Sequence, residues 1–397
     1  MNQRSLPLSF AFLFLLVASF ATPRVFAAER LVITEYKDAL GFLKPVPVNI
    51  TGFSGEADVA LKADLLFMGV QHVPLDQAQY LVNGSAAARV EGRLTDKVTK
   101  DIKLNKAYNG GLQRQQIHAL ADDIAKALTG LRGIAQTKVA FKAEKSPGHS
   151  EIYIADFDGH NPQAITSDNA IVSNPTWRGT STLLYNSYKL GNPHIFSHHL
   201  GSGARAAVAR HPGGNYSPAV SPDGSRVAMI LSKGGSPDLY VANIDGTGLK
   251  QLTKTRESES SPCWSPDGNT ICFSSRERGP TLLFTVPASG GTTRQVATIG
   301  APSPTEPDWS PDGKWIAFTS QTRTFQICIV QANGGRGGDA IPIVEGEDPS
   351  WAPNSRALMF CRGRDHAKQL SLLDVPTKQV KTLGRILESN SQPSWAK

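Results

Sequence analysis

Two short clusters of polar residues carry side chains that can bind metal ions. His194, His198 and His199 lie within one strand-like segment, and the tetrapeptide 156–159 (Asp-Phe-Asp-Gly) resembles the start of a calcium loop. Side chains alternate along a strand, so His194 and His198 share one face and His199 points to the other. The tetrapeptide lacks the remaining oxygen ligands of a calcium loop. We therefore expect an ordinary turn at 156–159, satisfied or exposed histidines, and no metal or cofactor.

The sequence also lacks the pattern of a serine hydrolase and the spacing of a zinc site. A hydrolase of the α/β class places its serine in a GxSxG elbow, and GxSxG does not occur in the 397 residues. The four cysteines, which follow no CxxC or zinc spacing, are Cys263, Cys272, Cys328 and Cys361. We expect them to be small buried hydrophobes, although disulfides are compatible with an oxidising compartment. No catalytic residue and no enzymatic activity are expected.

The first 27 residues have the composition of a secretory signal peptide. Arg4 precedes an uncharged run from Ser5 to Thr22, whose strongly apolar stretch is shorter than the roughly 20 residues of a membrane-spanning helix. Small residues permit cleavage after Ala27 or after Ala21, and we favour Ala27. The chain is therefore expected to be exported.

The charge distribution argues against a nucleic-acid partner. The formal net charge is +7 at pH 7, which is small for 397 residues, and Lys and Arg are scattered between acidic neighbours. A nucleic-acid binder concentrates its basic residues in a patch or stripe. We expect no nucleic-acid partner.

The strongest signal in the sequence is an anchor segment that occurs six times. The copies are 174–177, 217–220, 261–264, 306–309, 348–351 and 392–395, and successive copies end 42 to 45 residues apart. Three of them continue as Ser-Pro-Asp-Gly, a tight turn in which Pro fixes φ and Gly accepts positive φ. Strand-like runs such as 226–230 and 238–242 follow the turn. Four short strands in each period of about 44 residues are typical of a propeller blade.

The two ends of the repeat predict how the ring closes. The last anchor, 392–395, lacks following strands, whereas 137–141 and 151–155 read as strands without an anchor before them. Pairing of the last anchor strand with the blade that begins near residue 137 gives six blades and leaves no exposed sheet edge. We predict a six-bladed β-propeller over 135–397. Because no edge requires a second copy, we expect a monomer.

Residues 28–134 lack the repeat and predict a small α/β domain. Residues 45–50 read as a strand, 58–69 carry a helical stripe, and 86–104 read as two strands across a turn near Asp96. A second helix, 112–129, is followed by Gly130, where a C′ glycine belongs. The predicted fold class is therefore α+β with two domains, a small N-terminal α/β domain followed by an all-β six-bladed propeller.

These features together resemble the TolB family, the periplasmic component of the Tol-Pal cell-envelope system. The segment 114–130, running through Gly133 into 138–141, is similar to the helix-to-propeller junction of that family, and so is 231–241 after Ser-Pro-Asp-Gly. With the signal peptide, the α/β domain and six blades, the resemblance covers nearly the whole chain. It implies a non-enzymatic periplasmic adaptor that docks the peptidoglycan-associated lipoprotein Pal and exchanges it for the inner-membrane protein TolA. It also implies a role in outer-membrane integrity and in constriction during cell division.

The resemblance further implies where the partners bind. Pal would contact the residues just before the anchors, where the innermost strands begin: Asn215, Ser217, Glu259, Ser260, Ser261, Glu306 and Asp348. The segment that switches between Pal and TolA would be Glu29, Arg30, Leu31, Val32 and Ile33. Loops on a rigid scaffold concentrate recognition residues, which supports the first set independently of the family. The alternative is that these Ser, Asn and Asp residues only make turn contacts.

A second function of another class stays open at this point. An exported propeller can bind a carbohydrate or a peptide in its channel, outside any Tol system. Carbohydrate binding would favour a ring of aromatic residues at the channel mouth, and the sequence offers Tyr216 before one anchor but no such ring.

Overall fold

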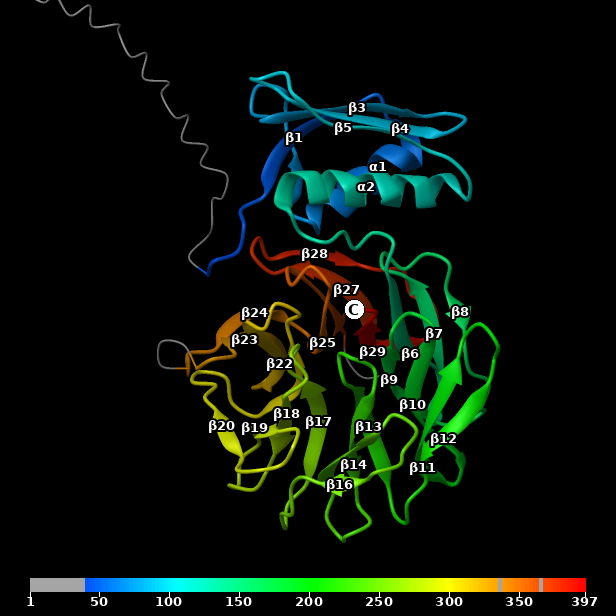
Figure 1. Cartoon of the computed structure of the whole chain (residues 1–397), viewed down its shortest axis with the longest axis vertical. Coiled ribbons are helices and arrows are strands. Elements are labelled where there is room, and N and C mark those ends of the chain that lie inside the picture. The colour runs from blue at the N-terminus through cyan, green and yellow to red at the C-terminus, as the bar shows by residue number, and fades with distance from the viewer. Residues whose placement is uncertain (1–39, 335–337, 364–366) are drawn as a thin grey trace, which may run out of the picture. The chain divides into compact units, whose positions relative to one another are not determined.

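The computed structural model describes residues 40–334, 338–363 and 367–397 (Figure 1). The expected signal peptide and the expected switch segment 29–33 lie outside the described residues. Residues 37–397 form one compact unit. Within the described part of the chain, every helix is too short or too polar to cross a bilayer.

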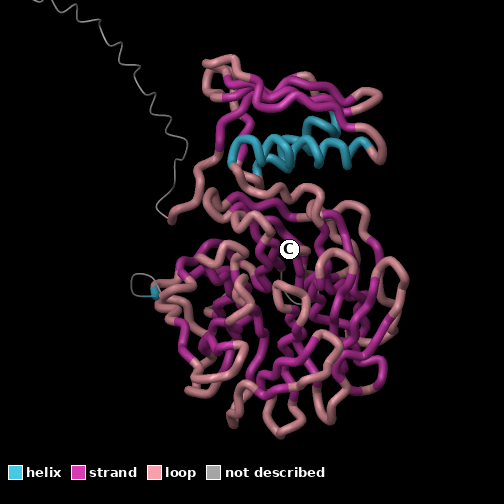
Figure 2. The backbone as a smooth tube through the Cα atoms, in the orientation of Figure 1, coloured by secondary structure: helices cyan, strands magenta, loops and turns pink. Residues whose placement is uncertain are grey.

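An α/β part precedes the propeller. Its elements are β1 (Val46–Thr51), α1 (Gly55–Leu66), β2 (Val70–His72), β3 (Tyr80–Ala86), β4 (Val90–Asp96), β5 (Ile102–Tyr108) and α2 (Gln113–Thr129). The sheet has the order β2-β1-β3-β4-β5, and Figure 2 shows both helices on one side of it. Ile117, Leu120 and Ile124 of α2 are buried in one cluster with Val82 and Leu94 of the sheet. The apolar stripe of α2 therefore holds the helix against the strands.

The predictions for this part were correct for α2 and β1 but incomplete for the sheet. The two strands expected over 86–104 correspond to β4 and β5, which lie a few residues further along the chain, whereas β2 and β3 (Tyr80–Ala86) were not predicted. On β3 only Val82 is fully buried, and Asn83, Gly84 and Ser85 follow it. That run shows none of the apolar alternation by which a strand is recognised. Helix α2 ends at Gly130 as expected, with a φ of 69°.

Six four-stranded antiparallel sheets follow, each built outward from an anchor strand, and we number these blades from β9. Blade 1 is β9 (Val172–Arg178), β10 (Thr182–Leu190), β11 (Asn192–His199) and β12 (Arg205–Ala209), and blade 2 is β13 (Asn215–Val220), β14 (Arg226–Leu231), β15 (Asp238–Asn243) and β16 (Lys250–Gln251). Blade 3 is β17 (Glu259–Trp264), β18 (Thr270–Ser275), β19 (Leu282–Pro287) and β20 (Arg294–Val296), and blade 4 is β21 (Pro304–Trp309), β22 (Trp315–Gln321), β23 (Phe325–Gln331) and β24 (Ile341–Glu345). Blade 5 is β25 (Glu347–Trp351), β26 (Ala357–Arg362), β27 (Gln369–Asp374) and β28 (Gln379–Thr382).

The sixth blade closes the ring as the sequence predicted. It combines β29 (Ser389–Trp395) with β6 (Lys138–Ser146), β7 (His149–Asp156) and β8 (Gln163–Ala164). The last strand pairs antiparallel with β6, and Trp395 lies opposite Val139. The blade is thus shared between the two ends of the repeat, which confirms six blades.

The anchor tryptophans join neighbouring blades. The indole Nε1 of Trp264 in blade 3 donates to the carbonyl of Ala219 in blade 2 at 2.8 Å, and Nε1 of Trp177 in blade 1 donates to Ser394 in blade 6 at 2.9 Å. Their rings lie in the apolar clusters between blades. Packing of the indole between blades explains why the anchor so often ends in Trp, and in Trp177 and Trp264 the N–H is satisfied as well. Blade 2 has Val220 instead.

The Ser-Pro-Asp-Gly segments form the predicted tight turns. In blade 2 the Ser221 hydroxyl accepts from the Arg226 amide at 2.9 Å, and Asp223 accepts from the Ser225 amide at 3.1 Å. Gly224 has a φ of 69°, which glycine adopts without strain. Hydrogen bonds from Ser221 and Ser225 lower the pKa of Asp223 to about 2. The turn therefore keeps an ionised carboxylate that fixes the start of the next strand.

Candidate functional site

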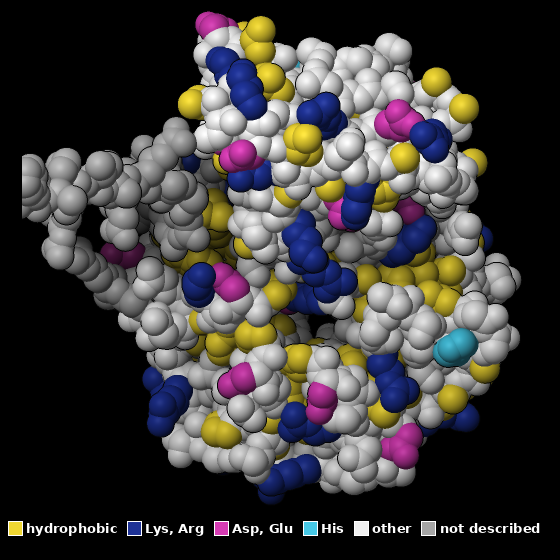
Figure 3. All heavy atoms as spheres, turned by 45° about the horizontal axis from the view of Figure 1, so that its top comes forward, with side chains coloured by type: hydrophobic (Ala, Val, Ile, Leu, Met, Phe, Trp, Pro, Cys, Tyr) yellow, Lys and Arg dark blue, Asp and Glu magenta, His cyan; other side chains and the backbone are white. Residues whose placement is uncertain are grey.

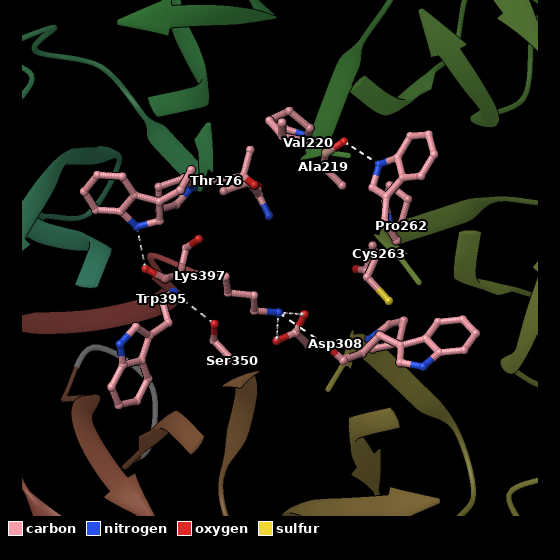
Figure 4. Close-up of a pocket in the computed structure, with 18 of the residues that line it drawn as sticks. Thr176, Ala219, Val220, Pro262, Cys263, Asp308, Ser350, Trp395 and Lys397 are labelled. Carbon is pink, nitrogen blue, oxygen red and sulfur yellow. Dashed lines mark hydrogen bonds and ion pairs between the residues drawn. The ribbon is translucent and has the colours of Figure 1, made fainter. Parts of the chain in front are cut away.

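The innermost strands of the six blades line a channel of about 500 Å³ (Figure 4). In every blade the residue before the anchor proline lines it. These six residues, which we call the channel ring, are Asn174, Ser217, Ser261, Glu306, Asp348 and Gln392. All of them have a left-handed backbone, with φ between 47° and 55°. Such φ values are uncommon outside glycine, so the six-fold recurrence marks a designed feature of the repeat.

A β-bulge explains the left-handed residue. In blade 2 the pairing of β13 with β14 shifts between Tyr216 and Ala219, and in blade 3 the pairing of β17 with β18 shifts between Ser260 and Cys263. A bulge leaves residues of the strand outside the ladder. The following residue is proline, which has no N–H to satisfy. The ring residue therefore needs an acceptor for its own amide from elsewhere.

For three of the six ring residues, the acceptor is the side chain of another ring residue. The amide of Asp348 donates to Glu306 Oε2 at 3.2 Å, and the amide of Gln392 donates to Asp348 Oδ2 at 3.1 Å. The amide of Asn174 then donates to Gln392 Oε1 at 2.9 Å. These bonds run from blade 4 through blades 5 and 6 to blade 1. These bonds join four of the six ring residues, Asn174, Glu306, Asp348 and Gln392, and we call this larger side of the ring the bonded half.

The other side of the ring has the remaining two residues, Ser217 and Ser261, and we call it the serine half. The amide of Ser217 donates to Asn186 Oδ1 of β10 at 2.9 Å, so the acceptor here comes from a second strand and not from the ring. Among the described residues, the hydroxyls of Ser217 and Ser261 have no hydrogen-bond partner. Both residues are partly exposed. Two free hydroxyls therefore face the channel on this side.

The charge in the channel is equally one-sided. Glu306, Asp308 and Asp348 all come from blades 4 and 5, and Lys397 reaches across to Asp308, with Nζ 2.7 Å from Oδ1 (Figure 4). Burial, together with the neighbouring Glu306 and Glu347 carboxylates, raises the pKa of Asp348. The bonded half is thus acidic and crowded, whereas the serine half is uncharged.

The structure places the expected docking residues in two environments. Ser217, Ser261, Glu306 and Asp348 line the channel, and Ser260 is exposed beside it. The other two expected residues, Asn215 and Glu259, are buried at the starts of β13 and β17 and do not line it. The expected switch residues Glu29 to Ile33 lie outside the described residues.

The two buried residues already have partners. Asn215 donates from Nδ2 to the His211 carbonyl at 3.0 Å and accepts from the His211 amide at 2.9 Å. Glu259 Oε2 accepts from the Leu239 amide at 3.0 Å and from the Thr253 hydroxyl. Burial raises the pKa of Glu259 to about 7. Both side chains hold a neighbouring loop in place, so they shape the channel mouth from beneath it.

Sequence reasoning missed part of the site. Asn174 and Gln392 occupy the same repeat position as Glu306 and Asp348, so a comparison of the six anchors alone could have found them. The contact between Lys397 and Asp308 could not be found that way, because it joins blades that meet only when the ring closes.

The residues of the metal and cysteine predictions lie away from the channel, except Cys263, which lines it. The tetrapeptide 156–159 is a turn, in which the Gly159 amide donates to the Asp156 carbonyl at 2.9 Å. His198 is buried, and burial lowers its pKa. The four cysteines, all free and buried, confirm the prediction of small buried hydrophobes. Three of them, Cys263, Cys272 and Cys328, belong to one apolar cluster between blades 3 and 4.

The charge on the surface and the aromatic residues of the channel wall help to judge whether the protein could bind nucleic acid or carbohydrate. On the face shown in Figure 3, Lys and Arg side chains are spread among acidic and uncharged ones. Four tryptophans line the channel, of which Trp177, Trp264 and Trp395 are at most 8% exposed and Trp309 is partly exposed. One partly exposed indole does not make the ring of aromatic residues that sugar stacking would favour. This arrangement disfavours the carbohydrate alternative.

Comparison with known proteins gives consistent matches. Residues 125–397 match the family described as the TolB beta propeller domain. The Tol-Pal system protein TolB of Anaeromyxobacter sp. (strain K) is 30% identical over 290 residues, which are 62% of this chain and 64% of that protein. The protein of the same name from Anaeromyxobacter dehalogenans is 30% identical over 267 residues, 56% of this chain and 60% of that protein. The chain thus spans less than two thirds of the length of these relatives.

A solved structure agrees over a longer stretch. The crystal structure of TolB from Acinetobacter baumannii superposes with a TM-score of 0.80 at 21% identity, covering 89% of this chain and 97% of that one. At this identity the likeness establishes the fold. It extends beyond the propeller to part of the region that precedes it, since 89% of the chain is covered.

Proposed function

The chain belongs to the TolB propeller family, and from this membership we propose that it is a periplasmic docking adaptor of a Tol-Pal system. Its partners would be a Pal-like peptidoglycan-associated lipoprotein and a TolA-like inner-membrane protein. In this role it binds proteins and catalyses no reaction. It would act as a monomer that supports outer-membrane integrity and constriction during division. The domains proposed are a signal peptide at 1–27, an α/β domain at 28–134 and the propeller at 135–397.

The observation that carries this proposal is the uneven channel ring. Ser217 and Ser261 hold free hydroxyls at the mouth on a backbone that the bulges fix, and the exposed Ser260 extends this surface. Glu306 and Asp348 each use only one carboxylate oxygen for the bond to the next blade, which leaves the other oxygen for a partner. Preorganised donors and acceptors bind without a large ordering cost. We therefore propose that Ser217, Ser260, Ser261, Glu306 and Asp348 form the docking face, and that Asn215 and Glu259 position its loops.

The partner-switching step would use the segment 29–33, which precedes the described residues. Removal of the signal peptide after Ala27 would leave this segment close to the new N-terminus. We propose that it is the part of the mature protein that TolA contacts.

The docking face is tested by adding one bulky charge to it. Ser260→Arg places a guanidinium at the mouth, and the matched control Thr292→Arg adds the same side chain to the exposed loop between β19 and β20 of the same blade. Immobilised mature protein, residues 28–397, is incubated with envelope extract, and bound lipoproteins are identified by mass spectrometry. We expect the wild type and Thr292→Arg to retain a Pal-like lipoprotein and Ser260→Arg to retain at least tenfold less.

Two other outcomes separate the parts of the proposal. Retention by Ser260→Arg at the control level, with all three melting temperatures equal, would place the docking face elsewhere and leave the adaptor function standing. Failure of the wild type to retain any lipoprotein would overturn the adaptor function and favour a peptide ligand of the channel.

A further inference from the structure

A cluster of ionisable side chains joins α1, α2 and the turn after β7. Its members are Asp64 of α1, Arg114 and His118 of α2, and Asp158 of the turn, and we call them the buried cluster. Asp64, His118 and Asp158 are between 1% and 4% exposed. Isolated charges are costly to bury, so groups this deep must compensate one another. The cluster therefore ties the two helices of the α/β part to the sixth blade.

The imidazole of His118 lies between two carboxylates. Its Nδ1 is 2.7 Å from Asp64 Oδ2, and its Nε2 is 3.7 Å from Asp158 Oδ2. Nε2 is buried and has no hydrogen-bond partner among the described residues. Phe157 packs edge-on against the ring, with centroids 5.7 Å apart. A ring held this way is aimed at Asp158 and is shielded from water on the Phe157 side.

Arg114 completes the charge balance. Its Nε donates to Asp158 Oδ2 at 3.1 Å, its Nη2 donates to the same oxygen, and its Nη1 is 2.7 Å from Glu56 Oε1. With His118 protonated, the two buried carboxylates face two cations. With His118 neutral, Asp64 and Asp158 face Arg114 alone, and one negative charge is left uncompensated in the interior.

A metal ion fits this arrangement less well than a proton does. Asp64, His118 and Asp158 each place one candidate ligand atom within 4.8 Å of the others. However, the two carboxylates face different nitrogens of the same imidazole, Asp64 facing Nδ1 and Asp158 facing Nε2. In addition, Asp158 already accepts a hydrogen bond from the guanidinium of Arg114. A cation at Asp158 would have to displace or approach that positive charge.

We propose that a proton held between Asp64 and His118 fastens helices α1 and α2 to the turn at Asp158, and that this contact weakens as the pH rises above neutral. The contact is then a pH-sensitive element between the α/β part and the propeller. It is independent of the docking face and of the identity of any partner.

The titration directions agree with this assignment. Burial and the bond to His118 compete at Asp64, and the net result raises the pKa of Asp64 to about 6. Burial lowers the pKa of His118, but the bond to Asp64 and the charges of Asp64 and Asp158 outweigh it, so the pKa of His118 is raised. Both groups hold their proton more tightly in the folded state. The contribution of His118 is fully present below the ordinary histidine pKa of 6.5 and is lost as the pH rises through its raised value. The contribution of Asp64 is fully present below the ordinary aspartate pKa of 3.8 and is lost as the pH rises to about 6.

The other charged groups around His118 do not change the expectation that the contact weakens as the pH rises. Arg114 lowers the pKa of Asp158, so the contact is lost in acid only below the ordinary aspartate value of 3.8. Asp122 of α2 has a raised pKa because it is buried, and it bonds the amides of Ala135 and Gln136. Glu56 and His160 are half-exposed or more and are screened by water. The contact is therefore expected to be strongest near pH 4, to weaken as Asp64 ionises towards pH 6, and to weaken further as His118 loses its proton above pH 6.5.

The test is hydrogen–deuterium exchange of the purified mature protein at pH 6 and pH 8, corrected for the intrinsic pH dependence of exchange. We expect peptides from α1, α2 and 155–161 to exchange at least fivefold faster at pH 8, while peptides from β23 of blade 4, which is a different blade from that of Glu259 with its pKa of about 7, do not change. His118→Gln should lose this difference. The matched control His198→Gln, another buried histidine, in blade 1, should keep it.

Three outcomes would overturn the proposal. They are equal corrected exchange at both pH values in the wild type, an unchanged pH difference in His118→Gln, and a loss of the difference in His198→Gln. If His118→Gln does not fold, Asp64→Asn serves in its place, because it removes the carboxylate that retains the proton, and the pH difference should again disappear.

Discussion

The two halves of the channel ring solve one backbone problem in different ways. All six ring residues have a left-handed φ and precede a proline, so each amide needs an acceptor outside the ladder. For Asp348, Gln392 and Asn174 the acceptor is the ring side chain of the preceding blade, as with Gln392 Oε1 and the Asn174 amide. At Ser217 it is Asn186 of β10. A ring side chain that joins two blades contributes to stability and has at most one polar atom left for a partner, whereas a serine without that bond keeps its whole hydroxyl for recognition.

The largest effect that separates the halves is expected for Gln392→Ala. It leaves the partly buried amide of Asn174 without its acceptor at the junction of blades 6 and 1, and the loss of such a hydrogen bond costs about 0.5–1.5 kcal/mol. Ser261→Ala removes a hydroxyl without a partner and should change the free energy of unfolding by less than about 0.5 kcal/mol. Chemical denaturation of both variants measures the difference.

The same pair of variants has the opposite expectation in lipoprotein capture. Ser261→Ala should weaken capture, and Gln392→Ala should retain it at temperatures where the variant is folded. Equal losses of stability in the two variants would contradict the division of the ring into a bonded half and a serine half.

A smaller effect, dependent on pH, is expected for Asp348→Asn. Burial and the charges of Glu306 and Glu347 raise the pKa of Asp348, so the folded state binds the proton more tightly than the unfolded state. The wild type therefore loses stability as the pH rises above the ordinary value of 3.8, and an asparagine, which still offers an acceptor to the Gln392 amide, does not. The melting temperature of the variant minus that of the wild type should grow from pH 4 to pH 8.

The control for this prediction is Glu345→Gln, which neutralises an exposed carboxylate on β24. Its melting temperature should follow that of the wild type at every pH. If Asp348→Asn were less stable than the wild type at pH 8, ionisation of Asp348 beside Glu306 and Glu347 would not destabilise the folded state, and the prediction would be wrong.

The propeller could be predicted from the sequence because its repeat uses residue types that only a few local structures accommodate. Pro-Asp-Gly fixes a turn, and the anchor tryptophan packs between two blades, where in Trp264 it also bonds a carbonyl. The sheet of the α/β part has no such markers, and β3 (Tyr80–Ala86) went unpredicted because its polar outer face hides the alternation.

The candidate site was only partly predictable for a related reason. Simple alternation along β13 would place Asn215 and Ser217 on one face, and both were expected at the mouth. The bulge between Tyr216 and Ala219 breaks that alternation, so Ser217 faces the channel while Asn215 turns into its own loop. No single residue of the segment predicts a bulge. Its signature is the proline that follows the ring residue in all six anchors, which becomes informative once the blades are aligned.

The smallest expected effect concerns the charge that crosses the channel. Lys397 pairs with Asp308, whose other role is to accept from the Trp351 amide at 2.7 Å. Both side chains are partly exposed, so Lys397→Met should cost at most about 1 kcal/mol. The same loss should appear in the wild type at 1 M salt, where the pair is screened, and the variant should be insensitive to that salt. A loss of several kcal/mol would instead mean that the bonded half depends on this lysine, and that its stability does not come from the hydrogen bonds between ring residues alone.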